Sequence, residues 1–237
     1  MPVLATLGEK LATREELEAI AAVLRRHPQV AVVCDEIYEF LLAPGHQHHS
    51  LAAVAPDLAD RVFSVNGFAK GWAMTGWRIG WLAGNADVVK AAIALQSQST
   101  SNVCSFAQFG ALAAIEGSRD CVHAMAAQFN ERRQLLSDGL QAISGLQLLP
   151  PEGAFYAFPD VSSTGLDSMT FCNRLLDEHG WRSCPVLPSA TTAASGSPAQ
   201  QPTAPSKTGS KRQTDVKICI NADSVSHSDL LKPTKQK

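Results

Sequence analysis

Residues 61–84, RVFSVNGFAKGWAMTGWRIGWLAG, hold two apolar runs on either side of a loop rich in glycine and tryptophan. The runs 61–67 and 78–84 have the apolar, β-prone character of strands. Between them stands a single lysine, Lys70, with Arg78 eight positions further on. An amine among small and apolar side chains is costly unless it has a partner or a chemical task. The surroundings of this stretch therefore decide what the lysine does.

Helix and strand signals alternate on both sides of this stretch. Upstream, Thr13 and Glu16 have the spacing of a capping box that opens a helix, and the apolar run 29–34, QVAVVC, is typical of a buried parallel strand. The order predicts an α/β fold with a mostly parallel sheet. Downstream, the periodicity predicts helices over 86–97, 103–117 and 118–144, strands at 146–150 (LQLLP) and 153–161 (GAFYAFPDV), and a helix at 168–180 (SMTFCNRLLDEHG).

The bulk composition narrows the class of protein. The 237 residues are 45% hydrophobic and 18% charged, and the net charge is −2. This balance predicts a protein with a sizeable core and gives no reason to expect nucleic acid or a membrane as partner. No apolar run has the length of a spanning helix and no signal peptide is recognisable, so we expect a cytoplasmic protein. The six cysteines form no CxxC pair, which predicts free thiols.

Two other features have plainer explanations than a functional site. His46, His48 and His49 form an HxHH cluster in the loop APGHQHHS. No further ligand is evident in the sequence, so a solvated loop is favoured over a metal site. Residues 181–237 include the stretch SATTAASGSPAQQPTAPSKTGSKRQ, whose composition cannot bury enough apolar surface to order a chain. We expect a disordered tail there.

Four chemically distinct side chains follow strand ends. Asp35 and Tyr38 come directly after the strand 29–34, Lys70 follows the strand 61–67, and Arg78 begins the next one. Ligands of open α/β sheets bind beyond the carboxyl ends of strands. An amine, a carboxylate, a phenol and a guanidinium suit pyridoxal 5′-phosphate, which needs an amine for its aldehyde and an anion for its ring nitrogen. On spacing and residue type alone, the plainer explanations are favoured: Asp35 as a helix cap or solvated loop residue, and Arg78 as a surface residue of an edge strand.

Longer stretches resemble one family. DEIYEFL (35–41), SVNGFAKGWAMTGWRIGWLAG (64–84), QSQSTSNVCSFAQFGALAAIEG (96–117) and GAFYAFPDVS (153–162) look like a class I aminotransferase of fold type I, closest to the bacterial aspartate aminotransferases. The resemblance covers about residues 9–180. It implies a homodimeric enzyme dependent on pyridoxal 5′-phosphate that transfers an amino group from an amino acid to a 2-oxo acid.

The resemblance also implies a role for each residue and a division of the chain. Lys70 would bond the cofactor's aldehyde and serve as the catalytic base, Asp35 would pair with the pyridine nitrogen, Tyr38 with the ring hydroxyl, and Arg78 with the phosphate. We expect residues 1–145 to be part of the large, cofactor-binding domain, and residues 146–180 to begin the small domain. No metal is implied.

The chain departs from the family pattern at both ends. The family's Asn-Pro-x-x-Pro-Thr-Gly motif and phosphate-binding loop are absent upstream of Thr13, and the Arg-Leu-Ser that follows residues like 168–180 is absent downstream. Restoring one G before the codon of Trp181 lets residues 181–211 encode such an ending, so we interpret 181–237 as out of frame. We therefore expect a chain that is truncated at the front and frameshifted after Gly180.

Three functions follow from these observations. The first is a pyridoxal-phosphate-dependent, aspartate aminotransferase-like enzyme. The second is an inactive gene product, which would bind the cofactor weakly or not at all because part of the pocket is missing. The third, a module whose basic tail binds an acidic partner, is disfavoured, because a frameshift explains that tail without selection.

Overall fold

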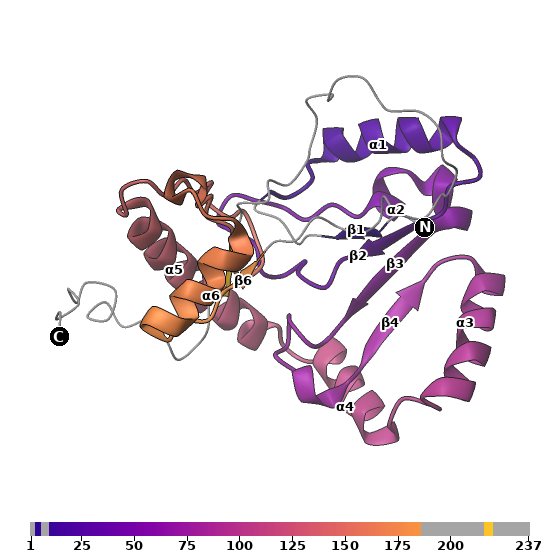
Figure 1. The fold of residues 1–237 in the computed structure, drawn as a ribbon. Helices are drawn as coiled ribbons and strands as arrows, with labels where there is room; N and C mark the ends of the chain where they lie inside the picture. Colours follow the sequence, from indigo (N-terminus) through magenta and orange to yellow (C-terminus); the bar gives the residue numbers. More distant parts are fainter. Residues whose placement is uncertain (1–2, 6–9, 186–215, 220–237) are drawn as a thin grey trace. The chain divides into compact units, whose positions relative to one another are not determined.

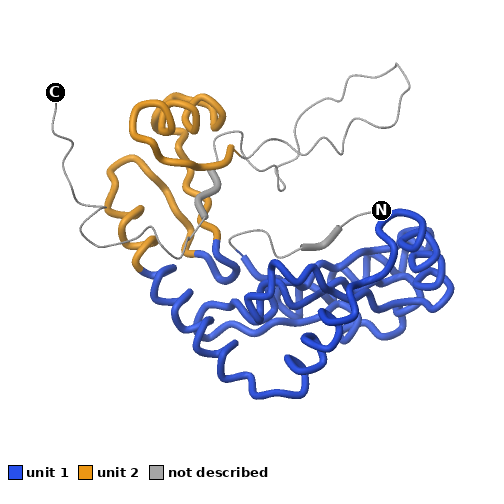
Figure 2. Tube along the Cα trace, turned by 90° about the horizontal axis from the view of Figure 1, so that it is seen from below, with its two compact units in different colours: residues 1–134, 151–155 blue, residues 135–150, 156–237 orange. Residues whose placement is uncertain are grey.

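The computed structural model describes residues 3–5, 10–185 and 216–219 (Figure 1). The chain divides into two compact units, residues 1–134 with 151–155 and residues 135–150 with 156–237 (Figure 2). Each unit is described by itself. Within the described ranges, no helix is long and apolar enough to cross a membrane.

The first unit is built on a four-stranded sheet. Its order is β1 (Val3–Ala5), β2 (Val32–Asp35), β3 (Val62–Gly67) and β4 (Gly80–Ala83). β1, β2 and β3 run parallel, while β4 pairs antiparallel with β3. The predicted α/β fold with a mostly parallel sheet is therefore present. The register places Asp35, the last residue of β2, beside Val65 of β3.

One face of this sheet carries the main apolar core. Along β1, β2 and β3 lie α1 (Arg14–Arg26) and α2 (Leu51–Val54), followed by the 3-10 turn η1 (Pro56–Arg61) (Figure 1). The predicted capping box is confirmed: Thr13 Oγ1 accepts from the Glu16 amide at 3.2 Å, and Glu16 Oε2 accepts from the Thr13 amide at 2.9 Å. The buried core consists of Leu17, Ala21, Leu24, Val32, Cys34, Leu51, Ala55, Leu58 and Val62.

Arg61 closes the carboxyl end of α1. Its guanidinium donates to the carbonyl oxygens of Leu24 at 2.6 Å, Val30 at 2.8 Å and His27 at 3.0 Å. A cation at this end also complements the helix dipole. We expect Arg61→Met to lower the free energy of unfolding by about 1–3 kcal/mol, since it removes charged hydrogen bonds from partly buried carbonyls. Urea denaturation measures the change.

Arg14 supplies the matched control for that prediction. It forms an exposed i,i+4 ion pair with Glu18 on the same helix. Such pairs contribute only about 0.3–0.5 kcal/mol. If Arg14→Met cost as much stability as Arg61→Met, the capping role of Arg61 would be contradicted.

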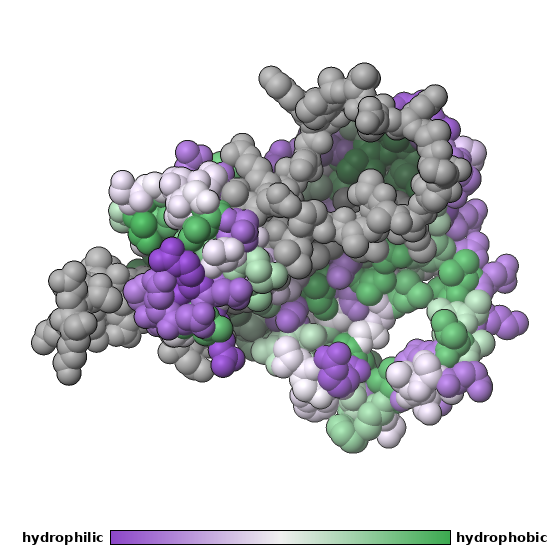
Figure 3. Space-filling view, viewed as in Figure 1, coloured by the Kyte–Doolittle hydropathy of each residue, from purple (hydrophilic) through white to green (hydrophobic). Residues whose placement is uncertain are grey.

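Three helices follow the sheet: α3 (Ala86–Ser99), α4 (Ser105–Glu116) and α5 (Asp120–Gln141). They confirm the helices predicted over 86–97, 103–117 and 118–144, with small differences at the ends. α3 buries none of its side chains, and α4 buries only Ala107 and Ala111. Apolar surface is visible over this part of the molecule (Figure 3). The large exposed side chains there are Val88, Ile93, Leu95, Phe106, Phe109, Leu112 and Ile115.

The second unit contains a small antiparallel sheet and one amphipathic helix. The sheet has the order β5 (Tyr156–Ala157), β7 (Val216–Cys219) and β6 (Cys184–Pro185). The helix α6 (Ser168–His179) is the one predicted at 168–180. It begins at Asp167, whose carboxylate accepts from the Thr170 amide at 2.8 Å. It ends at Gly180, which adopts the left-handed conformation.

Two predictions need correction in this unit. Strands were expected over 146–150 and 153–161, but only Tyr156–Ala157 forms one, with a lone bridge between Gln147 and Asp160. Prolines at 150, 151 and 159 lack the amide that a ladder needs. The tail expected to be disordered over 181–237 contains β6 and β7, and β7 pairs with both β5 and β6. Residues 186–215 and 220–237 of that tail lie outside the described residues.

The described cysteines are free thiols, as predicted. Cys34 and Cys172 are buried, whereas Cys104, Cys121 and Cys184 are exposed. Burial, and next the nearby Glu36 carboxylate, raises the pKa of the Cys34 thiol to about 11. We therefore expect iodoacetamide at pH 8 to alkylate Cys104 and Cys121 while sparing Cys34, because the thiolate is the reacting form. Peptide mapping measures this, and equal alkylation of Cys34 in the folded protein would contradict it.

Candidate active site

Asp35 stands at the carboxyl end of β2. Its side chain is half-buried, and Oδ1 accepts a hydrogen bond from the Ile37 amide at 3.3 Å. The next residue continues the ladder, because the Glu36 amide donates to the Val65 carbonyl at 2.8 Å. The sheet therefore places this carboxylate at its carboxyl edge, in the position where α/β proteins bind ligands.

Lys70 lies on the loop of the β3–β4 hairpin. Gly67 and Gly80 pair across the two strands, so closely that a Cβ on Gly67 would lie 2.9 Å from the Gly80 Cα. The Phe68 amide donates to the Ile79 carbonyl at 3.4 Å, and the Ala73 amide to the Lys70 carbonyl at 3.3 Å. These contacts close the loop at its base and turn the chain just after the lysine.

Aromatic packing holds the same loop. Trp72 lies with its ring 5.0 Å from that of Phe40 and 5.1 Å from that of Phe68, as measured between centroids. A Cβ on Gly71 would lie 2.6 Å from the Phe40 ring, so the loop backbone runs directly against the segment that follows β2. The segments that carry Tyr38 and Lys70 are thus packed together.

Phe155 brings two of the predicted site residues together. The Lys70 Nζ lies 5.0 Å from the centroid of its ring, and the ring of the buried Tyr38 meets it edge-on at 5.3 Å. Phe129 of α5 stacks on the ring at 5.7 Å. An ammonium over an aromatic face is held by the ring quadrupole. Sequence reasoning did not single out Phe155, although the cluster of aromatic residues in GAFYAF was a visible signal.

Asn66 joins the ends of β2 and β3 from within the sheet. Its side-chain amide donates to Glu39 Oε1 at 2.8 Å, and its Oδ1 accepts from the Gly67 amide at 2.7 Å. Asn66 is 5% exposed, and its bond to Gly67 is buried while that to Glu39 is partly buried. They fix the turn that contains Tyr38 to the strand that leads to Lys70.

Arg78 lies at the far end of the loop in a different setting. It is exposed, adopts the left-handed conformation with φ of 52°, and donates from Nη1 to the Thr75 carbonyl at 3.0 Å. The described side-chain hydrogen bonds of Asp35 and of Arg78 lie within their own segments. The structure therefore brings Tyr38 and Lys70 onto one aromatic ring, with Asp35 and Arg78 on the two flanking segments.

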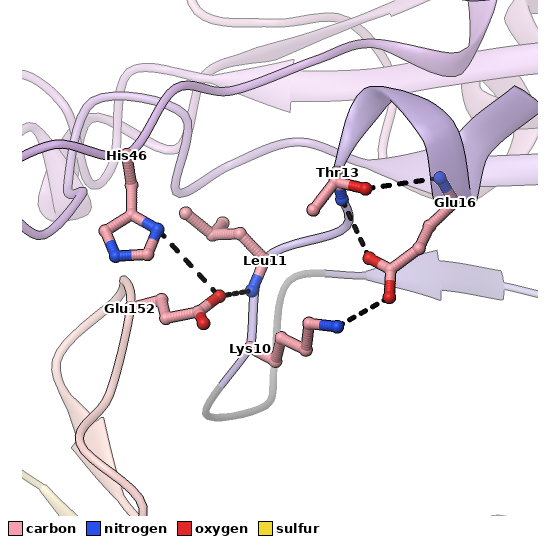
Figure 4. A network of polar contacts seen from close by, with 6 residues as sticks. All are labelled: Lys10, Leu11, Thr13, Glu16, His46 and Glu152. Carbon is pink, nitrogen blue, oxygen red and sulfur yellow. Dashed lines mark hydrogen bonds and ion pairs between the residues drawn. The ribbon is translucent and has the colours of Figure 1, made fainter.

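The histidine cluster faces carboxylates. His46 Nδ1 lies 3.9 Å from Glu152, and His48 Nε2 lies 3.8 Å from Glu36. Within residues 10–185, no group of three metal-ligating side chains comes together. Glu152 also accepts from the Leu11 amide at 2.7 Å, which ties the segment 151–155 to the chain that enters α1 (Figure 4). The same figure shows Glu16 between Lys10 and Thr13.

The sheet thus carries a carboxylate, Asp35, at the end of β2 and an amine, Lys70, on the loop beyond β3, at the edge where α/β sheets bind ligands. Residues 10–192 match the family model described as "Aminotransferase class I and II". The chain therefore belongs to the class I and II aminotransferases, which confirms the family resemblance.

The curated relatives include two proteins that illustrate the similarity. The probable aspartate/prephenate aminotransferase of Rickettsia bellii is 45% identical over 146 residues, which are 62% of this chain and 37% of that protein. The aspartate/prephenate aminotransferase of Nitrosomonas europaea is 40% identical over 175 residues, covering 69% and 44%. The chain thus spans less than half the length of these relatives.

Solved structures show the same fold. The aspartate aminotransferase of Rhizobium meliloti superposes with a TM-score of 0.76 at 29% identity, over 96% of this chain and 54% of that one. An aspartate aminotransferase tetra mutant from Thermus thermophilus superposes with a TM-score of 0.72 at 31% identity, over 96% and 56%. The α/β fold is therefore that of the aminotransferases.

Proposed function

We propose that this chain carries the lysine-bearing part of a pyridoxal-phosphate-dependent enzyme of fold type I that transfers an amino group from an amino acid to a 2-oxo acid. The observation that carries the proposal is the place of Lys70. It is a half-buried amine on the loop after a parallel strand, in contact with the ring that also packs Tyr38. Membership of the aminotransferase family supports a role for that amine in bonding the cofactor's aldehyde.

The donor set fits the cofactor in part. When bound, pyridoxal 5′-phosphate supplies an aldehyde for an amine and a ring that accepts electrons. Lys70 offers the amine, Asp35 an anion at the sheet edge, and Tyr38 a phenol between them in sequence. Arg78 is the predicted phosphate ligand on this chain, and it is exposed. The fit is therefore better around the ring and aldehyde than around the phosphate.

Each side chain would have a separate task. The Lys70 Nζ would bond the aldehyde and, once released by the substrate amine, take and return the substrate's proton. The Asp35 carboxylate would keep a proton on the ring nitrogen. The Tyr38 hydroxyl would donate to the ring oxygen, and the Arg78 guanidinium would bind phosphate oxygens as a planar fork.

The substrates and the assembly belong to the same proposal. Relatives named as aspartate/prephenate aminotransferases support a dicarboxylic amino donor and a 2-oxo acid acceptor. We also propose a homodimer, the commonest symmetric assembly. Residues 1–145 are assigned to the large domain and residues 146–180 to the small domain, with 181–237 out of frame.

The alternative function is an inactive chain without cofactor binding. The exposure of Arg78 favours it, because one solvated guanidinium does not replace the ring of backbone amides that usually binds a phosphate. In that case Lys70 would have no more affinity for the cofactor than a surface lysine.

Borohydride trapping separates the two. The chain is incubated with millimolar pyridoxal 5′-phosphate, reduced with borohydride, and mapped by mass spectrometry. We expect low overall occupancy with the adduct enriched on Lys70 over Lys10 and Lys90, which are exposed. Pyridoxal without its phosphate is the control for simple amine reactivity. Labelling of Lys70 no greater than that of Lys90 would overturn the proposal and favour the inactive alternative.

A further inference from the structure

Arg133 is a buried cation with an unusual set of partners. It lies on α5 and is 5% exposed. Its Nη2 donates to the Ala154 carbonyl at 2.7 Å and to the Leu41 carbonyl at 3.4 Å, and its Nη1 donates to Asn130 Oδ1. Among the described residues no carboxylate pairs with it, and its Nε has no partner. Burial lowers the pKa of the guanidinium. Buried charged side chains are rare unless they pair with an opposite charge, so the burial of Arg133 needs an explanation.

The two carbonyls belong to segments that are bonded to each other. The Ala154 amide donates to the Leu41 carbonyl at 2.7 Å, and the Ala43 amide donates to the Glu152 carbonyl at 2.8 Å. Ala154 adopts the left-handed conformation with φ of 56°, which is uncommon for a residue with a Cβ. Arg133 therefore binds the junction of these segments at the point where the backbone turns.

Both segments lead directly to the candidate site. Phe155 follows Ala154 in the chain, and the Leu41 amide donates to the Tyr38 carbonyl at 2.9 Å. Phe155 is the ring that contacts both Tyr38 and the Lys70 ammonium. A displacement of Ala154 would consequently move the aromatic surface against which the lysine rests.

We propose that Arg133 is a positioning residue for Lys70: its guanidinium fixes the Leu41 and Ala154 carbonyls, and so holds the Phe155 ring beneath the lysine amine. This inference deepens the proposed function, since it rests on Lys70 as the reactive amine. Because its test uses no cofactor, a failure of this positioning role can be distinguished from a failure of the proposed aminotransferase function.

Arg61 offers a matched control for the test. It too is a guanidinium of the first unit with three acceptors, but its acceptors are the Leu24, His27 and Val30 carbonyls at and just after the end of α1. Arg133→Met and Arg61→Met remove the same group and leave the same side chain. If Arg133 had only a structural role, both variants would have the same effect on the reactivity of the Lys70 amine. If it positions Lys70, only Arg133→Met should change that reactivity.

Trace acetylation with acetic anhydride measures the reactivity of Lys70, with Lys90 on the exposed surface of α3 as internal standard. An ammonium–ring contact corresponds to a factor of about two to five between the held and the released lysine. We expect the Lys70 rate to rise by about that factor in Arg133→Met and to stay unchanged in Arg61→Met. Hydrogen exchange of a peptide spanning 151–157 should also accelerate only in Arg133→Met.

Two further variants keep the inference testable. Arg133→Lys keeps the cation without the planar fork and should restore the Lys70 rate in part. Phe155→Leu removes the ring but leaves the Arg133 hydrogen bonds to Leu41 and Ala154. It should therefore raise the acetylation rate of Lys70 without accelerating hydrogen exchange at 151–154. This variant also tests the inference if Arg133→Met fails to fold. Unchanged Lys70 reactivity in Phe155→Leu, or equal increases in the Arg133 and Arg61 methionine variants, would overturn the inference.

Discussion

Replacing Lys70 by alanine is expected to lower the rate of transamination by more than about 10⁴-fold, since under the proposed function it removes both the amine that would bond the aldehyde and the base that would move the substrate proton. The measurement requires a complete enzyme. One is obtained by joining residues 10–180 to the remaining segments of the Nitrosomonas europaea relative, to which the chain is 40% identical. Single-turnover kinetics with aspartate then isolates the chemical step from cofactor loading.

Two lysine variants make that result specific. Lys90→Ala removes an exposed amine of α3 and should leave the rate unchanged. Lys70→Arg keeps a cation over the Phe155 ring but offers no amine for the aldehyde, so it should be as inactive as Lys70→Ala. Substantial turnover by either Lys70 variant would show that another group is the catalytic amine.

Asp35→Asn is expected to lower the same rate by about 10- to 1000-fold, because a nearby opposite charge favours a protonated ring nitrogen by roughly this factor. Asparagine keeps the size of the side chain and the oxygen that accepts from the Ile37 amide at 3.3 Å. The local turn is therefore preserved, and the loss reports the missing charge. An unprotonated ring is a poor electron acceptor.

Asp57→Asn is the matched control for this second result. Asp57 pairs with Arg25 on the exposed surface, at 2.7 Å between Oδ1 and Nη2. Its substitution removes the same charge far from the candidate site and should change stability slightly and turnover not at all. If Asp35→Asn and Asp57→Asn were equally active, Asp35 would have no role in tuning the cofactor.

The elements that sequence reasoning located depend on neighbouring residues. The capping box joins Thr13 to Glu16, three positions apart, and the three helices from Ala86 to Gln141 follow from short-range periodicity. The strands around Lys70 were found because each is a continuous apolar run. The antiparallel direction of β4 was not predicted, because parallel and antiparallel strands have the same local sequence pattern.

The contacts that sequence reasoning missed join distant parts of the chain. Phe155 reaches Lys70 and Tyr38 only because the segment 151–155 returns to the first unit after α5. Arg133 appeared to be an ordinary helix residue, and its carbonyl partners cannot be inferred from periodicity. The short strand Tyr156–Ala157 replaced a longer predicted one because proline and a left-handed alanine interrupt the run. Tertiary packing decided each of these features.

The closed base of the β3–β4 hairpin has a consequence for the order of folding. Every contact that shapes its base is made between residues close in sequence, so forming it requires little loop-closure entropy. Asp35, in contrast, reaches the same sheet edge through a parallel crossover, which forms more slowly. The backbone of the lysine loop is thus closed by one contiguous segment, residues 62–83, while the anion and the Phe40 and Phe155 rings that pack against the loop depend on long-range assembly. Transplanted alone onto the edge of another sheet, such a segment would bring the loop of its lysine with it but not the Phe155 ring under the amine.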